Sequence, residues 1–236
     1  MKEKDILPHI SGIAAVNYRL SGDPSEGRNA RHPDHLEDVK LAIGFLNSRY
    51  GFEDRYILLG HSAGATLAFQ LAMEQQPAWS SSSAPKKPRA ILGASGIYDL
   101  RRLLNSIWPL VEYREEYLHM LESAFGPGGF VYGEQNEEDG CGSDWDLASP
   151  AKATAYGSSW FNAQLAMLVH SPDDELVPLE QSTQFAGVLE SSLPPGAVCH
   201  KRFDMGGSHD DIWRKPEEII HLISEAVMIL VERGSV

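Results

Sequence analysis

The chain has 236 residues, 42% of them hydrophobic, and its 33 Asp and Glu outnumber 20 Lys and Arg to give a formal net charge of -13. This length and apolar content predict one folded domain with a sizeable core and exclude an intrinsically disordered chain. The acidic balance argues against nucleic acid or an anionic membrane as a partner, and no apolar run approaches the length of a membrane-spanning helix.

Short β-rich runs alternate with longer amphipathic segments, which is typical of a mostly parallel sheet flanked by helices, an α/β fold. The predicted strands are residues 12–17, 55–59, 90–94, 165–170 and 197–203. The predicted helices are residues 35–50, 63–75, 113–125 and 216–231. Pro33 and Gly51 flank the first of these helices, as expected for helix boundaries.

The segment 100–150 interrupts this alternation within what we treat as a single domain, residues 1–236. It is too long for an ordinary crossover, and its acidic run GEQNEEDGCGSD predicts a loop. The segment is rich in aromatic residues, namely Trp108, Tyr113, Tyr117, Phe125, Phe130, Tyr132 and Trp145. A cap over a pocket and a small satellite core are the two interpretations. The run at 79–88, WSSSSAPKKP, predicts a polar surface connection.

The strongest chemical signal is the run Gly60-His61-Ser62-Ala63-Gly64, which follows a predicted strand and opens a predicted helix. A G-x-S-x-G run in this context is typical of a nucleophile on a strained strand-to-helix turn. The glycines leave room for the turn and for close helix packing, and the helix N-terminus favours a developing oxyanion. We predict Ser62 as a nucleophile, with a tight structural turn as the alternative. His61 is expected to pack or hydrogen-bond locally.

A nucleophilic serine needs a base, and the base needs an orienting carboxylate. After such a turn the order along the chain is serine, acid, histidine. The strand at 165–170 is followed by the run SPDDELVP, and active sites form at the carboxyl ends of parallel strands. We predict Asp174 as the acid, with Asp173 or a solvated charged loop as the alternatives.

Three histidines follow that acid, His200, His209 and His221. His200 lies within a predicted strand and His221 on the last predicted helix, so packing or a surface position explains each more simply. His209 lies in the loop MGGSHDD after the last strand, where glycines allow the chain to return across the sheet edge. We predict His209 as the general base and expect the adjacent Asp210-Asp211 to be solvated or helix-capping.

Other polar clusters carry weaker signals. The run at 32–38, HPDHLED, holds possible metal ligands, but its histidines straddle a helix start and no third ligand group follows at matching spacing. The glycine pairs at 128–129 and 206–207 do not fit dinucleotide or phosphate loops. The run at 93–96 resembles a strand and turn rather than a second nucleophile. We therefore expect neither a metal nor a cofactor.

Four of these features together resemble the kynurenine formamidase family of fungal type. They are the elbow GHSAGATLAFQ, the preceding ARHPDHLEDV helix with Phe45-Leu46, the strand end SPDDELVP and the loop GGSHDDIW. Because GHSAG occurs in many esterases, the specificity of the resemblance rests on the combination, which runs from about Ile10 to the C-terminus. The resemblance implies an α/β-hydrolase that removes the formyl group from N-formylkynurenine in tryptophan breakdown, with Ser62, Asp174 and His209 as nucleophile, acid and base.

The chain departs from the family pattern in one respect. Members carry a His-Gly-Gly-x-Trp segment before the strand that reads GIAAVNYRLS here, and its amides form half of the oxyanion hole beside the amide of Ala63. The resemblance therefore implies an N-terminally incomplete fold, from either a truncated chain or a genuinely short protein. It also implies a gap in the sheet unless the strand at 12–17 moves across to pair.

The leading hypothesis is a serine hydrolase that acts on an aryl formamide, a small-molecule substrate whose ring the aromatic insertion could hold. A carboxylesterase on the same machinery is the first alternative, and an inactive hydrolase-like chain is the second. Two cysteines, Cys141 and Cys199, favour a reducing compartment, and the first residues, MKEKDILPHI, lack a signal or transit pattern, so we expect a cytoplasmic protein. The sequence leaves a homodimer open.

Overall fold

The computed structural model describes residues 6–73, 86–106, 113–127 and 144–234. Its centre is a parallel sheet of four strands in the order β1 (Ile57–His61), β2 (Ala90–Ala94), β3 (Leu165–Val169) and β4 (Val198–Arg202). The register aligns the last residues of all four strands, so the loops that follow them leave the sheet from one edge.

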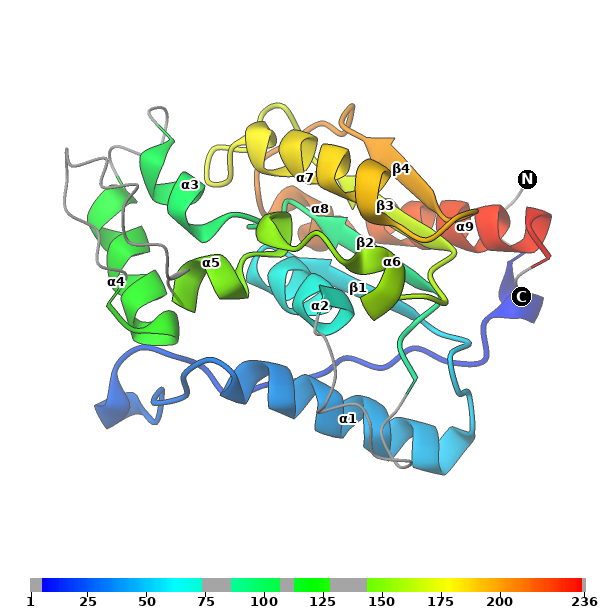
Figure 1. The fold of residues 1–236 in the computed structure, drawn as a ribbon, viewed down its shortest axis with the longest axis horizontal. Coiled ribbons are helices and arrows are strands. Elements are labelled where there is room, and N and C mark those ends of the chain that lie inside the picture. The colour runs from blue at the N-terminus through cyan, green and yellow to red at the C-terminus, as the bar shows by residue number, and fades with distance from the viewer. Residues whose placement is uncertain (1–5, 74–85, 107–112, 128–143, 235–236) are drawn as a thin grey trace.

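Helices connect the strands and cover both faces of the sheet (Figure 1). In chain order they are α1 (Asp34–Tyr50), α2 (Ala63–Met73), α3 (Leu100–Asn105), α4 (Arg114–Phe125), α5 (Asp144–Ala148), α6 (Tyr156–Ser159), α7 (Leu179–Ser192), α8 (Asp211–Arg214) and α9 (Pro216–Glu232). Short 3-10 turns lie at Leu7–His9, Pro24–Glu26 and Pro150–Lys152.

The central strand β3 shows how the sheet divides the core. Its side chains are buried throughout, and alternate residues point to opposite faces. Leu165, Met167 and Val169 pack in the cluster that includes α9, whereas Ala166 and Leu168 pack in the cluster that includes α2 and α7. A strand buried on both faces reads as a continuous apolar run, which made this strand recognisable in the sequence.

Most of the predicted elements are confirmed, with ends that differ by one or two residues. The prediction of a strand at 12–17 is wrong, because these residues join no ladder and most of them are exposed. A strand needs a neighbour that satisfies its N–H and C=O groups. In the described chain, β1 has β2 on one side, and residues 12–17 do not pair with its other edge.

The helix α7 was not predicted from the sequence, because its buried face is partly polar. Gln181 and Ser182 are buried beside Phe185 and Leu189, which weakens the apolar period on which a helix prediction depends. Gln181, 1% exposed, accepts hydrogen bonds from the backbone N–H groups of Tyr98 (2.9 Å) and Asp99 (2.8 Å) and donates to the Asp99 carbonyl (3.0 Å). It thereby holds the connection between β2 and α3.

Residues 107–112 and 128–143 of the predicted insertion lie outside the described residues, and so do 79–85 of the predicted surface connection and 74–75 of the predicted helix at 63–75. The described part forms α3, α4 and α5, which Figure 1 shows grouped at one end of the molecule. Leu103, Leu121 and Trp145 form an apolar cluster there with Val177 of the loop after β3. These contacts correspond to the satellite-core interpretation, and a role as a cap over a pocket stays a prediction.

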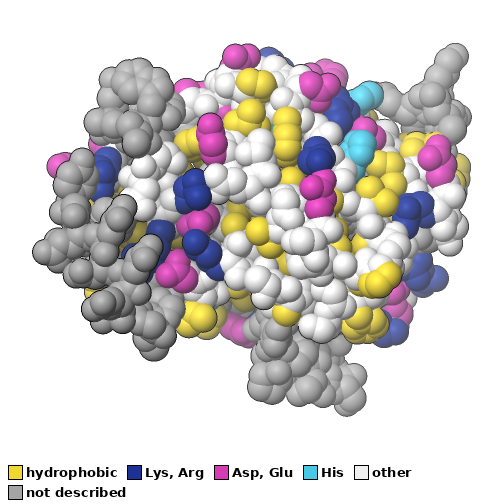
Figure 2. Space-filling model, turned by 45° about the horizontal axis from the view of Figure 1, so that its top comes forward, with side chains coloured by type: hydrophobic (Ala, Val, Ile, Leu, Met, Phe, Trp, Pro, Cys, Tyr) yellow, Lys and Arg dark blue, Asp and Glu magenta, His cyan; other side chains and the backbone are white. Residues whose placement is uncertain are grey.

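The surface of the described residues carries both signs of charge. Figure 2 shows Lys and Arg side chains interspersed with Asp and Glu on one face. None of the helices in the described ranges combines the length and the apolar character that a membrane crossing requires.

Replacing Gln181 with leucine should lower the free energy of unfolding by about 2–4 kcal/mol, because two backbone N–H groups and a carbonyl lose their partners inside the core. Urea unfolding measures the change. Gln184→Leu alters an exposed glutamine on the same helix and should stay within about 0.5 kcal/mol of the parent. Equal stability of the two variants would contradict this role for Gln181.

Candidate functional site

Ser62 lies on the turn from β1 into α2, in a backbone conformation that few residues adopt. Its φ is +52°, in the left-handed region. Its N–H donates to the Ala94 carbonyl at 2.9 Å, and its own carbonyl accepts from the N–H of Ala65 at 3.0 Å. The sheet on one side and the helix on the other thus hold Ser62 in this strained turn.

Gly60 allows α2 to approach the sheet. A Cβ at this position would lie 2.2 Å from the Gly64 carbonyl oxygen and 2.5 Å from the Ala65 nitrogen. A Cβ on Gly64 would meet nothing within 4 Å among the described residues. The prediction that both glycines make room for close packing of the helix is therefore confirmed for Gly60 and wrong for Gly64. The backbone of Gly64 itself occupies the space next to Gly60.

The N-terminus of α2 opens beside Ser62. The helix begins at Ala63, so the Ala63 amide is among the first N–H groups, which have no acceptor within the helix. Ala63 is exposed and Ser62 is partly exposed. The amide and the positive end of the helix dipole can therefore stabilise an anion that forms on a group bound to Ser62.

Asp174 lies in the loop after β3 with a fully buried side chain. Its Oδ1 accepts the N–H groups of Leu176 (3.0 Å) and Val177 (2.8 Å). Burial acts to raise the pKa of Asp174, but the neighbouring His170 and His209 imidazoles and the hydrogen bond from the Val177 amide outweigh it and hold that pKa far below its usual range. The carboxylate is therefore ionised. Asp173, in contrast, is exposed.

His209 comes from the loop between β4 and α8. Its Nδ1 lies 2.9 Å from Oδ2 and 3.0 Å from Oδ1 of Asp174, so the ring donates to the ionised carboxylate. Its backbone N–H donates to Glu175 at 3.0 Å. Because Nδ1 carries the proton, Nε2 of the neutral ring is left as an acceptor.

His61 joins this loop to the serine turn. Its Nε2–H donates to the His209 carbonyl at 2.9 Å, and the two imidazole centroids are 4.5 Å apart. Burial, together with the neighbouring His209, lowers the pKa of His61. Since His61 directly precedes Ser62, the structure brings the imidazole of His209 beside the turn that bears the serine.

The loops after β3 and β4 are also tied together directly. The Ser171 hydroxyl donates to the Gly207 carbonyl at 2.6 Å. Gly207 has a φ of +105°, a backbone conformation in which any other residue would be strained. Asp211 accepts the Ser208 N–H at 3.2 Å, but Ser208 precedes α8, and the residue at the N-cap position, Asp210, makes no side-chain cap hydrogen bond. The expected capping role is therefore wrong, whereas both carboxylates are partly exposed and pair with Arg214 and Lys215.

The other histidines considered in the sequence lie elsewhere. His200 pairs with Glu225 at 2.8 Å, and His221 is exposed on α9. His35 contacts the Ser21 hydroxyl at 2.8 Å, and Asp38 pairs with Arg19. Within the described ranges, no group of three or more His, Cys, Asp and Glu side chains is placed to hold a metal ion.

Sequence reasoning missed three residues that support the acid and the base. Glu175 holds the His209 amide, and buried His170 lies 3.4 Å from Asp174 Oδ2. Tyr117 of α4 donates to the Leu176 carbonyl at 2.9 Å, and burial, with Asp174 and Glu175 nearby, raises its pKa to about 12. The position of His170 at a strand end, four residues before the acid, was a signal that the sequence offered.

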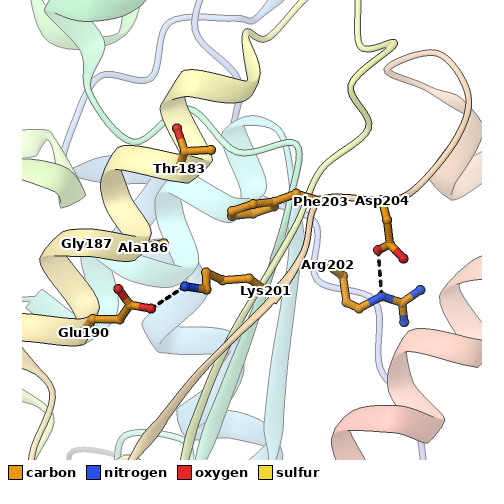
Figure 3. Close-up of a pocket in the computed structure, with 8 residues that line it drawn as sticks. All are labelled: Thr183, Ala186, Gly187, Glu190, Lys201, Arg202, Phe203 and Asp204. Carbon is orange, nitrogen blue, oxygen red and sulfur yellow. Dashed lines mark hydrogen bonds and ion pairs between the residues drawn. The ribbon is translucent and has the colours of Figure 1, made fainter.

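A groove between α7 and β4 does not include these residues (Figure 3). It is lined by Thr183, Ala186, Gly187, Glu190, Lys201, Arg202, Phe203 and Asp204. Lys201 points toward α7 and pairs with Glu190 at 2.5 Å, whereas Arg202 points to the other side and pairs with Asp204 at 3.0 Å. Its charged side chains satisfy one another, so we place the candidate site at the serine turn.

Known proteins resemble the chain in sequence. Residues 4–126 match the BD-FAE family model. The chain is 83% identical over 219 residues to kynurenine formamidase avaC of Aspergillus versicolor, which covers 93% of this chain and 76% of that protein. It is 33% identical over 232 residues to the kynurenine formamidase-like hydrolase fscH of Fusarium equiseti, covering 94% of this chain and 71% of that protein.

Solved structures share the fold at low sequence identity. The acetyl ester-xyloside bifunctional hydrolase from Caldicellulosiruptor lactoaceticus has a TM-score of 0.57 and 18% identity, covering 87% of this chain and 68% of that one. The esterase Est2 from Thermogutta terrifontis has a TM-score of 0.57 and 16% identity, covering 89% and 68%. These likenesses confirm the α/β-hydrolase fold class.

Gly60→Ala should lower the free energy of unfolding by about 1–3 kcal/mol, because the new methyl group collides with the backbone of α2. Gly64→Ala is the matched control and should be neutral or stabilising by up to about 1 kcal/mol, since alanine favours the helix. Urea unfolding compares the two. A Gly60→Ala chain as stable as Gly64→Ala would show that α2 does not need this close approach.

Acid should destabilise the fold in part through Asp174. Its pKa in the folded chain is lower than in the unfolded chain, so its ionised form stabilises the fold at neutral pH, and this stability is lost as the pH falls below about 4. In Asp174→Asn the free energy of unfolding should therefore depend less steeply on pH between about 5 and 2. Urea unfolding across this range tests it, with Asp173→Asn as the control for loss of one charge. Parallel curves for the parent and Asp174→Asn would refute the linkage.

Proposed function

The chain belongs to the kynurenine formamidase family, and we propose that it hydrolyses the formamide of N-formylkynurenine to kynurenine and formate. In this proposal Ser62 is the nucleophile, His209 the general base and Asp174 the acid that orients it. The observation that carries the proposal is the buried Asp174–His209 pair, 2.9 Å apart, whose histidine contacts His61, the residue next to Ser62 on its strained turn. The 83% identity to a kynurenine formamidase supports the choice of substrate.

The first step forms a formyl ester. The Ser62 hydroxyl gives its proton to His209 Nε2 while its oxygen bonds to the formyl carbon, and the carbonyl electron pair moves onto the oxygen. The Ala63 amide at the start of α2 donates to this oxyanion. The ionised carboxylate of Asp174 accepts the hydrogen bond from Nδ1 of His209 and stabilises the imidazolium. The electron pair on the oxyanion then re-forms the carbonyl, the bond between the formyl carbon and the aniline nitrogen breaks, and His209 protonates that nitrogen so that kynurenine leaves.

The second step removes the formyl group from Ser62. A water molecule gives a proton to His209 and attacks the ester carbon, and His209 returns that proton to the serine oxygen as formate leaves. The neutral ring is thus restored after each cycle. The substrate's aromatic part is expected to lie toward α3–α5, which meet the acid loop at Val177 and through Tyr117.

A carboxylesterase is the second candidate, favoured by the fold likeness to esterases. The same serine, base and acid hydrolyse an ester, so only the relative rates separate the two functions. Comparison of kcat/KM on N-formylkynurenine and on a short p-nitrophenyl ester decides between them. Faster turnover of the ester by orders of magnitude would overturn the formamidase assignment.

A fluorophosphonate should label the chain once, at Ser62, and the label should be absent from Ser62→Ala. Turnover of N-formylkynurenine should fall by about 10³-fold or more in that variant, because the nucleophile is removed. Ser158→Ala, which alters an exposed serine, is the matched control and should keep both label and turnover. Label or turnover that survives in Ser62→Ala would contradict the role of Ser62.

A further inference from the structure

A second imidazole touches the carboxylate of the acid, and the proposed reaction does not use it. His170 follows β3, and its side chain is fully buried. Its Nε2 lies 2.8 Å from the Val177 carbonyl and 3.4 Å from Asp174 Oδ2. Its Nδ1 lies 2.7 Å from the hydroxyl of Ser182 on α7, which is also buried.

These partners define which nitrogen of the neutral His170 ring carries the proton. A carbonyl oxygen only accepts hydrogen bonds, so Nε2 of His170 carries a proton and donates it to Val177. The same N–H faces Asp174. In the neutral ring Nδ1 is an acceptor, and the Ser182 hydroxyl can donate to it. Both nitrogens are therefore satisfied, one by the acid loop and one by α7.

The turn at residues 174–177 is consequently held from both ends. Asp174 accepts the Val177 N–H at 2.8 Å, and His170 holds the Val177 carbonyl. Without the imidazole, a buried carbonyl would lose its donor and Asp174 would lose one neighbour that favours its ionised form. Oδ2 would then keep His209 as its hydrogen-bond partner, and the turn that carries the carboxylate would be held less firmly.

We propose that His170, supported by Ser182, is a positioning residue that holds the carboxylate of Asp174 toward Nδ1 of His209. Its consequence for turnover rests on the proposed function, whereas its consequence for the Asp174–His209 contact does not. A misplacement of about 1 Å in an active site can cost about 10²-fold in rate.

Two substitutions distinguish the role of Nε2 of His170 from the role of its Nδ1. The amide nitrogen of His170→Gln reaches the place of Nε2 and can still donate to Val177, whereas the amide of His170→Asn reaches only the place of Nδ1. We expect His170→Asn to lower kcat on N-formylkynurenine by about 10–100-fold with little change in KM, and His170→Gln to restore most of it. Equal kcat for the parent and His170→Asn would overturn the proposal.

A proton NMR measurement tests the contact without turnover. The proton shared by His209 Nδ1 and Asp174 should give a downfield resonance, assigned by its loss in His209→Gln. It should persist in His170→Gln and shift or disappear in His170→Asn. An unchanged resonance in His170→Asn would overturn the proposal. This result does not depend on the hydrolase function, which failure of Ser62 labelling in the parent chain would refute separately.

Ser182→Ala covers the case in which His170→Asn does not fold. It keeps the imidazole but removes the group that holds Nδ1, so kcat and the His209 resonance should change in the same direction as in His170→Asn, by a smaller amount. A folded Ser182→Ala chain with unchanged kcat and an unchanged resonance would overturn the supporting role of α7. Thermal unfolding of each variant identifies the chains that fold.

Discussion

A carboxylate buried as deeply as that of Asp174 stays ionised only where hydrogen-bond donors surround it. Those donors are the amides of its own loop and His209 from beyond β4, and the N–H of His170, which follows β3, lies 3.4 Å from Oδ2. Each donor also fixes the segment that supplies it. The ionised carboxylate of Asp174 therefore holds its own loop and the loop of His209 together, and the position of the His209 ring depends on that carboxylate.

The parallel sheet brings the Asp174–His209 pair to the same edge as the serine. Because the last residues of the four strands are in register, the turn after β1 and the loops after β3 and β4 leave from the same edge. His61 then connects the first of these to the last through the His209 carbonyl. Gly60 and the strained φ of Ser62 let α2 start directly after the strand, with Ala63 as its first residue next to the serine.

Local patterns in the sequence were enough to predict the turn at Ser62 and most of the strands. A G-x-S-x-G run and an apolar strand are each encoded by neighbouring residues. The parts that escaped depend on distant partners. Glu175 acts on an amide 34 residues away, and α7 uses a buried glutamine to hold the connection after β2. The strand expected at 12–17 has the right composition, but strand formation requires a pairing partner that composition does not reveal.

The central claim is that Asp174 and His209 act as one unit on Ser62. The most direct test is the rate at which a fluorophosphonate modifies Ser62 in the parent, Asp174→Asn, His209→Gln and the double variant. Residues that act as a unit are strongly non-additive, so each single variant should slow labelling by about 10²-fold or more and the double variant little further. Unchanged rates in the single variants, or losses that multiply in the double variant, would contradict the account.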